Sequence, residues 1–254
     1  MNDVLVLWDI DGTLLNAGGV GRDLFHVVFL QLFGRSLSAY APVAGRTDRA
    51  IILETLTLAG VNEPRRYVDP FIASLGAHAP LMRPAMASRG RVLPGAAAAL
   101  ALVAGRAHQS VLTGNVRPLA EAKLAALGLR DLLDLCIGAY GDDHEDRTQL
   151  VEVARRRAAD VHGRSLPSAF AGTSTVVVGD TPLDVSAALS AGARAVGVAT
   201  GSYSAADLSA AGAHAVLPTL TDTSLVLETL LGEGASPSPA MELAGQTDRP
   251  GDRS

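Results

Sequence analysis

Short runs of hydrophobic residues alternate with longer segments in which hydrophobic residues recur at helical spacing. Six runs predict strands, at residues 4–8, 108–113, 132–139, 175–181, 193–201 and 213–220. Helices are predicted between them at 118–127, 148–162, 183–191 and 205–211. Because the strand runs lack polar alternation, we expect helices to cover both faces of the sheet. The order predicts an α/β fold with a doubly wound parallel sheet.

The segment after the first predicted strand has a different pattern. From about residue 20 to 86 it is helical, with helices expected over 22–34, 47–60 and 63–82. Glycine-rich stretches flank it on both sides, as expected for two hinges. We therefore predict a core of residues 1–17 and 93–232, a helical cap domain over 18–92, and a disordered tail over 233–254.

Composition and charge narrow the class of protein. The 254 residues carry a formal net charge of −5, which argues against nucleic acid as a partner. The N-terminal run has no basic segment before it, so it does not predict a signal peptide, and no membrane span is expected. The single cysteine, Cys136, lies in a predicted buried strand and excludes an internal disulfide. We expect a cytoplasmic protein.

Acidic and hydroxyl side chains follow three of the predicted strands. Asp9 and Asp11 follow the first, Thr113 follows the second, and Asp180 follows the run of valines at 176–178, with Asp184 four residues further on. Ligands gather at the carboxyl ends of strands in an open parallel sheet. Either acidic motif alone is compatible with a turn or a helix N-cap. Together, four carboxylates at one edge predict a divalent cation, with Mg²⁺ preferred.

The motifs "DIDGTLL", "LTGN" and "GDTPLD" resemble those of the haloacid dehalogenase-like hydrolase superfamily in order and spacing, and the insert matches the position of that superfamily's helical cap. "GRTD" and "TGN" also resemble its phosphoglycolate phosphatase-like branch. The resemblance implies Mg²⁺-dependent hydrolysis of a small phosphorylated metabolite, a phosphomonoester, through an aspartyl-phosphate. It implies a nucleophile at Asp9, a general acid and base at Asp11, and Mg²⁺ bound by Asp9, the Asp11 carbonyl and Asp180, with support from Asp184. The implied phosphate-binding residues are Gly12, Thr13, Thr113, Gly114 and Asn115.

One motif departs from that pattern. The family usually places a lysine shortly before the last acidic motif, where this chain has Arg147, and we expect Arg147 to replace it. Lys123 fits poorly, because it lies in the middle of a predicted helix. Arg46 of "GRTD" has two open interpretations. In the first it lies over the site and holds a substrate carboxylate or excludes water, and in the second it points to solvent beside the helix cap Thr47.

Several alternative functions use the same fold. A sugar phosphomutase remains open, and so does a non-catalytic binding module, although the module is expected to have lost Asp9 or Asp11. A dehalogenase is disfavoured because the chain keeps Asp11, and a phosphonate hydrolase because the insert has no lysine for a Schiff base.

Overall fold

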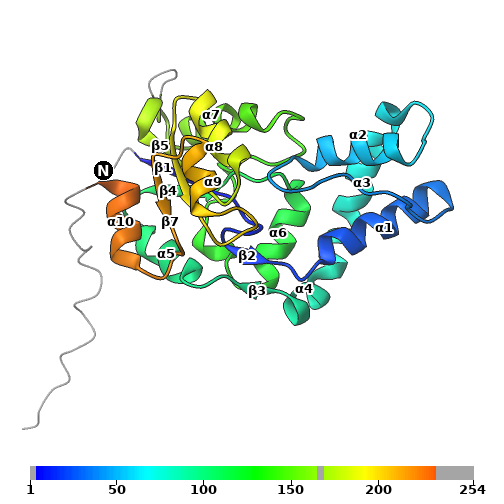
Figure 1. Ribbon diagram of the computed structural model, residues 1–254, viewed down its shortest axis with the longest axis horizontal. Coiled ribbons are helices and arrows are strands. Elements are labelled where there is room, and N and C mark those ends of the chain that lie inside the picture. Colours follow the sequence, from blue (N-terminus) through cyan, green and yellow to red (C-terminus); the bar gives the residue numbers. More distant parts are fainter. Residues whose placement is uncertain (1–3, 165–168, 233–254) are drawn as a thin grey trace, which may run out of the picture.

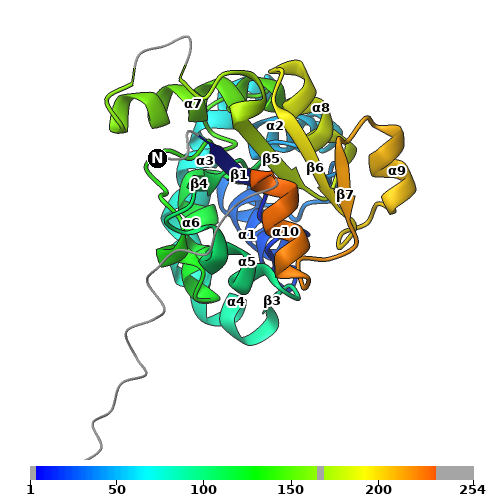
Figure 2. The same ribbon diagram turned by 90° about the vertical axis from the view of Figure 1, so that its left-hand side faces the viewer.

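A five-stranded parallel sheet forms the base of the core in the computed structural model, which describes residues 4–164 and 169–232. The tail predicted over 233–254 lies outside the described residues. The strands run in the order β4 (His108–Val111), β1 (Leu5–Trp8), β5 (Thr175–Gly179), β6 (Arg194–Val198) and β7 (Ala215–Leu217) (Figure 2). Leu7 of β1 pairs with Ser110 on one side and Val177 on the other. The first strand of the chain therefore lies inside the sheet, with partners from distant parts of the sequence.

Helices cover both faces of the sheet, as the hydrophobic pattern predicted. Side chains alternate along β1, so that Val6 and Trp8 pack into one hydrophobic cluster and Leu5 and Leu7 into another. The first cluster includes residues of α5 (Ala96–Val103), α6 (Arg117–Ala126) and α10 (Thr223–Leu231). The second includes residues of α7 (Leu150–Val161), α8 (Pro182–Ser190) and α9 (Ala205–Ala210). The fold is the expected doubly wound α/β arrangement.

The helical insert joins the core through a two-stranded antiparallel ribbon of β2 (Leu15–Asn16) and β3 (Arg91–Val92). Between these strands lie the α-helices α1 (Val20–Phe33), α2 (Asp48–Leu58), α3 (Val68–His78) and α4 (Arg83–Arg89), with the 3₁₀ turns η1 (Pro64–Tyr67) and η2 (Ala79–Met82) (Figure 1). The single helix expected over 63–82 is therefore three segments. Pro64 begins η1 and Pro80 lies at the start of η2, because proline favours the first turn of a helix and interrupts its interior.

Helix α6 is shared between the core and the insert. Ala120 and Leu124 belong to the cluster under the sheet. Val116, Leu119 and Ala122, from the same part of the chain, belong to the cluster of the insert, which is built on residues such as Phe25 and Phe71. Figure 1 shows α6 between the sheet and the helices of the insert. One helix thus separates two hydrophobic cores.

The strand predicted over 132–139 is wrong. This segment makes only an isolated bridge between Leu112 and Ala139, and Cys136, expected to be buried, is exposed. The Asp134 carboxylate accepts a hydrogen bond from the Cys136 backbone N–H at 3.0 Å, a local turn that competes with strand pairing. Ile137 and Ala139 are nevertheless buried, so the hydrophobic residues of the run contribute to the core without forming a strand.

Within residues 4–164 and 169–232, no helix combines the length and the apolar composition that a membrane span requires.

Candidate active site

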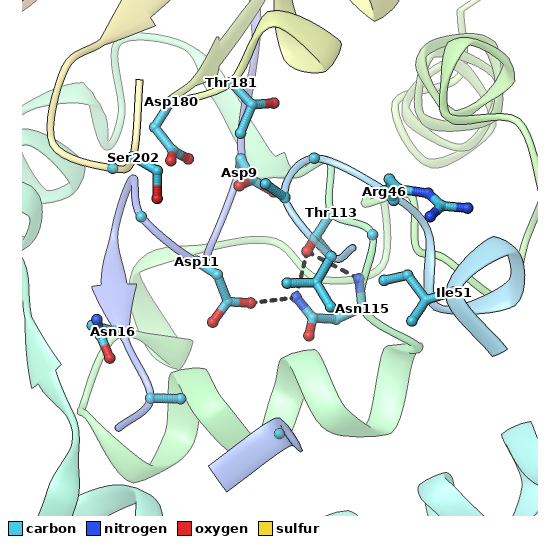
Figure 3. Close-up of a pocket in the computed structure, with 18 of the residues that line it drawn as sticks. Asp9, Asp11, Asn16, Arg46, Ile51, Thr113, Asn115, Asp180, Thr181 and Ser202 are labelled. Carbon is cyan, nitrogen blue, oxygen red and sulfur yellow. Dashed lines mark hydrogen bonds between the residues drawn. The ribbon is translucent and has the colours of Figure 1, made fainter. Parts of the chain in front are cut away.

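A cavity of about 770 Å³ lies between the carboxyl ends of the strands and the insert. Its core side is lined by Asp9, Asp11, Thr113 and Asp180, which come from the ends of β1, β4 and β5 (Figure 3). The parallel sheet therefore brings together the residues that the three separate motifs singled out. Its other side is lined by the insert, including the loop that leads into α2.

Asp9 is buried directly after β1, where its backbone N–H donates to the Val178 carbonyl at 2.8 Å. Its Oδ1 accepts a hydrogen bond from Nη2 of Arg147 at 2.8 Å. The same Nη2 donates to Asp184 and to the Leu112 carbonyl. Arg147 begins a 3₁₀ turn, η4 (Arg147–Gln149), which the Asp146 side chain caps. The structure thus brings the basic residue of the atypical motif onto the acid at the end of β1.

The carboxylates of Asp9, Asp180 and Asp184 form a buried cluster. One ligand oxygen from each lies within 4.8 Å of the others. Burial raises the pKa of Asp9 well above its ordinary value, the Arg147 charge opposes this, and Asp184 and Asp180 raise it further. Burial and the charge of Asp184 raise the pKa of Asp180 to about 7. When ionised, three negative charges face the single positive charge of Arg147, and this deficit suits a divalent cation.

Two glycines let Asp180 approach the end of β1. A Cβ atom on Gly12 would lie 2.3 Å from Oδ2 of Asp180, and one on Gly201 only 1.7 Å from the same atom. Gly12 also has a φ of +89°, which disfavours any residue with a side chain. Thr13 donates to Oδ1 of Asp180 at 3.1 Å, so its hydroxyl orients this acid rather than facing the cavity. Gly201, on the loop after β6, carried no sequence signal.

Asp184 lies at the third position of α8 and forms a capping box with Thr181. Its Oδ2 accepts from the Thr181 hydroxyl at 2.7 Å and from the Thr181 backbone N–H at 3.0 Å. Its Oδ1 accepts from Arg147. The helix-cap interpretation of this motif is therefore correct, and the same carboxylate also belongs to the buried acidic cluster, because its two oxygens have different partners.

Asp11, Asn115 and Lys123 form a second polar group beside the first. Oδ2 of Asp11 accepts from Asn115 Nδ2 at 2.7 Å and from Lys123 Nζ at 2.5 Å, and Lys123 also donates to Oδ1 of Asn115 at 2.6 Å. Both Nδ2 and the backbone N–H of Asn115 donate to Oγ1 of Thr113 (Figure 3). The sequence prediction set Lys123 aside because it lies within a helix, but α6 carries it into the cavity.

Comparison with known proteins agrees with this geometry. A model of the haloacid dehalogenase-like hydrolase family matches residues 6–189. The chain belongs to this family. A curated relative, "Probable phosphatase IndB" of Dickeya dadantii (strain 3937), is 27% identical over 245 residues, which cover 92% of this chain and 97% of the relative.

Solved structures of low identity share the fold of this hydrolase. A hydrolase from Pseudomonas syringae aligns with a TM-score of 0.62 and 19% identity, over 89% of this chain and 98% of that chain. CbbY from Rhodobacter sphaeroides, solved in complex with phosphate, aligns with a TM-score of 0.56 and 21% identity, over 87% of this chain and 96% of that chain.

In this hydrolase, the loop of the insert before α2 lies directly on the loop after β4. Asp48 N donates to the Gly114 carbonyl at 2.6 Å, and Val116 N donates to Oδ2 of Asp48 at 2.8 Å. Asp48 is buried, and this burial raises its pKa to about 6. Thr47 caps α2 as expected and its hydroxyl also donates to the Glu145 carbonyl at 2.7 Å. The insert is therefore held over the cavity by backbone and carboxylate contacts.

Arg46, on the same loop, turns its side chain away from the carboxylates (Figure 3). Its guanidinium pairs with Glu54 at 2.6 Å and donates to the Pro42 carbonyl at 3.1 Å, both within the insert. In this structure the Arg46 side chain is therefore bound to groups of the insert. Arg46 is among the residues that line the cavity.

Proposed function

We propose that this hydrolase is a Mg²⁺-dependent phosphatase of small phosphomonoesters that works through an aspartyl-phosphate at Asp9. The observation that carries the proposal is the buried Asp9 carboxylate, which Arg147 holds by Oδ1 at 2.8 Å. This contact leaves Oδ2 as the oxygen available for attack on phosphorus. The 27% identity to a curated protein described as a phosphatase supports the same reaction class.

Mg²⁺ would be held by Asp9, Asp180 and the Asp11 carbonyl, and Asp184 would support this site through its hydrogen bond with Arg147. When bound, Mg²⁺ would neutralise charge on the transferring phosphoryl group. Arg147 would contribute further positive charge, and the Thr113 hydroxyl would donate to a phosphoryl oxygen. Asn115 N–H already donates to Thr113, so its contribution as a direct phosphate donor requires rearrangement of this bond.

The reaction proceeds in two steps on these residues. Asp9 Oδ2 bonds to phosphorus while the bond from phosphorus to the ester oxygen breaks, and Asp11 gives its proton to that oxygen. Water then bonds to phosphorus, its proton passes to Asp11, and the bond between Asp9 and phosphorus breaks. Inorganic phosphate and free Asp9 result.

Positive charge in the cavity favours a substrate whose leaving group carries an anionic substituent, as a phosphoglycolate-type substrate does. Arg22 and Arg91 line the cavity, and the structure shows no carboxylate partner for either among the described residues. The Arg22 guanidinium lies over the Tyr40 ring, 5.2 Å from its centroid, which holds it at the wall of the insert. We propose that the insert acts as a cap and that these arginines, rather than Arg46, face the substituent.

The decisive experiment is a phosphatase assay on the purified protein with p-nitrophenyl phosphate and a panel of phosphorylated metabolites. Turnover should require Mg²⁺, disappear with EDTA and be absent from the matched variant Asp9→Asn. Absence of Mg²⁺-dependent turnover on every compound would contradict the proposal and favour a non-catalytic binding module. Conversion of a sugar 1-phosphate to its 6-phosphate without phosphate release would instead identify a phosphomutase.

A further inference from the structure

Lys123 is the only lysine in the sequence, and the structure buries it. Its ammonium group is paired with Asp11 and hydrogen-bonded to Asn115, at 2.5 and 2.6 Å. An ammonium is strongly hydrated, so its burial is unfavourable unless such partners compensate for the lost water. The remaining positive charges of the chain are arginines. We therefore ask what Lys123 contributes to this site that the surrounding arginines do not.

We propose that Lys123 is a positioning residue for Asp11. Together with Asn115 it binds Oδ2 of the Asp11 carboxyl group, so that Oδ1 is the oxygen that exchanges a proton with the substrate. The inference rests on the proposed function, in which Asp11 is the general acid and base.

The geometry supports this role because packing alone does not fix Asp11. Its side chain is 44% exposed, whereas the Lys123 side chain is only 6% exposed and is carried by a helix. Two donors, Asn115 Nδ2 and Lys123 Nζ, meet at the same Oδ2. Figure 3 shows the Asp11 and Asn115 side chains directed toward each other. An exposed carboxyl group held by two buried donors has far fewer accessible rotamers than a free one.

Lys123 also couples Asp11 to the group proposed to bind phosphate. It donates to Oδ1 of Asn115, which fixes the orientation of the amide, and Nδ2 of the same amide donates to Thr113 at 2.8 Å. Loss of the lysine would remove one of the two donors to Oδ2 of Asp11, while the two hydrogen bonds from Asn115 to Thr113 would remain. Catalysis that depends on a correctly placed proton donor should respond strongly to such a loss.

In the reaction, Lys123 keeps all of its protons. The Oδ1–H bond of Asp11 breaks as the ester oxygen leaves phosphorus, and the proton goes to that oxygen. In the second step a water proton returns to Oδ1 as the water oxygen bonds to phosphorus. Lys123 donates hydrogen bonds to Oδ2 throughout, so it orients the acid without taking part in proton transfer.

The test compares leaving groups that differ in their need for a proton. An alkyl alkoxide is a poor leaving group and depends on the acid, whereas p-nitrophenolate leaves with little help. The quantity to compare is kcat/KM, because it reports the first step, whereas the second step is the same for every ester. For Lys123→Met, which keeps the length and removes the charge, we expect kcat/KM to fall about 10- to 100-fold on an alkyl phosphate and less than about 3-fold on p-nitrophenyl phosphate. Equal losses of kcat/KM on both esters would overturn the proposal.

Additional variants separate this role from a structural one. Asp11→Asn should show the same preference in a stronger form, and the double variant with Lys123→Met should lose no more than Asp11→Asn alone. Additive losses in the double variant would contradict a shared role. Arg117→Ala, on the same helix but paired with Glu121 at the surface, is the matched control and should retain both rates.

Two outcomes need a separate measurement. Should Lys123→Met fail to fold by circular dichroism, Lys123→Gln removes the charge but keeps a polar group at this buried position, and it should give the same leaving-group preference. If this second variant lowers kcat/KM equally on both esters, the proposal fails. The two ways of failing can be told apart. If the wild-type protein has no Mg²⁺-dependent turnover, the proposed function is wrong. If the wild-type protein is active but its Lys123 variant shows no leaving-group preference, only the role of Lys123 is wrong.

Discussion

Replacing Gly114 by alanine would place a methyl group where the backbone of the insert lies. The added Cβ would be 1.9 Å from the Arg46 carbonyl oxygen, 2.8 Å from its carbonyl carbon and 3.2 Å from Cα of Thr47. Gly114 is not among the residues with positive φ, so its own conformation accepts alanine. The perturbation therefore acts on the contact between the two loops.

The size of the displacement follows from these distances. Ordinary contact begins at 3.4 Å, so the Arg46 carbonyl must move by about 1.5 Å from its 1.9 Å position. A shift of that size breaks the 2.6 Å hydrogen bond from Asp48 N to the Gly114 carbonyl. Overpacking of this kind costs about 1–3 kcal/mol. For a protein of this length, each kcal/mol lowers the Tm by roughly 2–4 °C.

The assay is thermal unfolding together with phosphatase kinetics. We expect Gly114→Ala to lower the Tm by roughly 2–12 °C and kcat/KM at least about 10-fold, because the insert no longer lies in its native position over the cavity. Gly76→Ala is the matched control, since its Cβ would meet only the Pro118 side chain at 3.2 Å. A Gly114→Ala protein with the stability and kcat/KM of the wild type would refute the inference that the two loops are in contact in the active enzyme.

Two further predictions concern the buried charges. Arg147→Ala should lower kcat about 100-fold or more and destabilise the fold by about 3–5 kcal/mol, because Asp9 and Asp184 lose the cation that pairs with them. Arg147→Lys should recover part of the lost kcat and part of the lost stability. Equal values for the alanine and lysine variants would contradict a role for the charge. Because the pKa of Asp180 is raised from 3.8 to about 7, its neutral form stabilises the metal-free fold below about pH 4, and this stability is lost as the pH rises through 7. The Tm in EDTA should therefore fall between about pH 4 and 7 and change little from this cause above pH 8, where Mg²⁺ should raise it more. An unchanged trend in Asp180→Asn would assign the effect to other groups.

The sequence predicted the sheet and the acids that meet at its edge, because both depend on local patterns. Runs of valine and leucine specify buried strands, and parallel strands place their carboxyl ends together whatever lies between them. Asp9 and Asp180 are 171 residues apart in the chain, yet no knowledge of the intervening segments was needed to place both at one edge. The segment around Cys136 failed because a local Asp134 turn competes with strand pairing, and hydrophobicity does not report that competition.

The position of Lys123 in the cavity could not be predicted from its distance to a motif in the sequence, because it depends on which face of helix α6 is turned toward the site. Helix α6 follows the loop after β4, so residues at helical spacing from that loop share the face that looks back at the site. Val116 and Leu119 lie on this buried face, and Lys123 continues it. A lone charged residue at a buried position of an amphipathic helix was the available signal. The orientation of Arg46 could not be predicted in this way. Several acidic residues lie near it in the sequence, and nothing in the sequence selects Glu54 as its partner.

The double membership of α6 limits how this enzyme can be rebuilt. A chimera that exchanges only residues 18–92 for the insert of another family member would leave Val116, Leu119 and Ala122 facing side chains that did not evolve to fit them. The same surface would become exposed to water if the insert moved away from α6. A unit that can be exchanged between family members therefore consists of the insert together with one face of a helix that lies outside it in sequence. Exchange of this larger unit should transfer the substrate range.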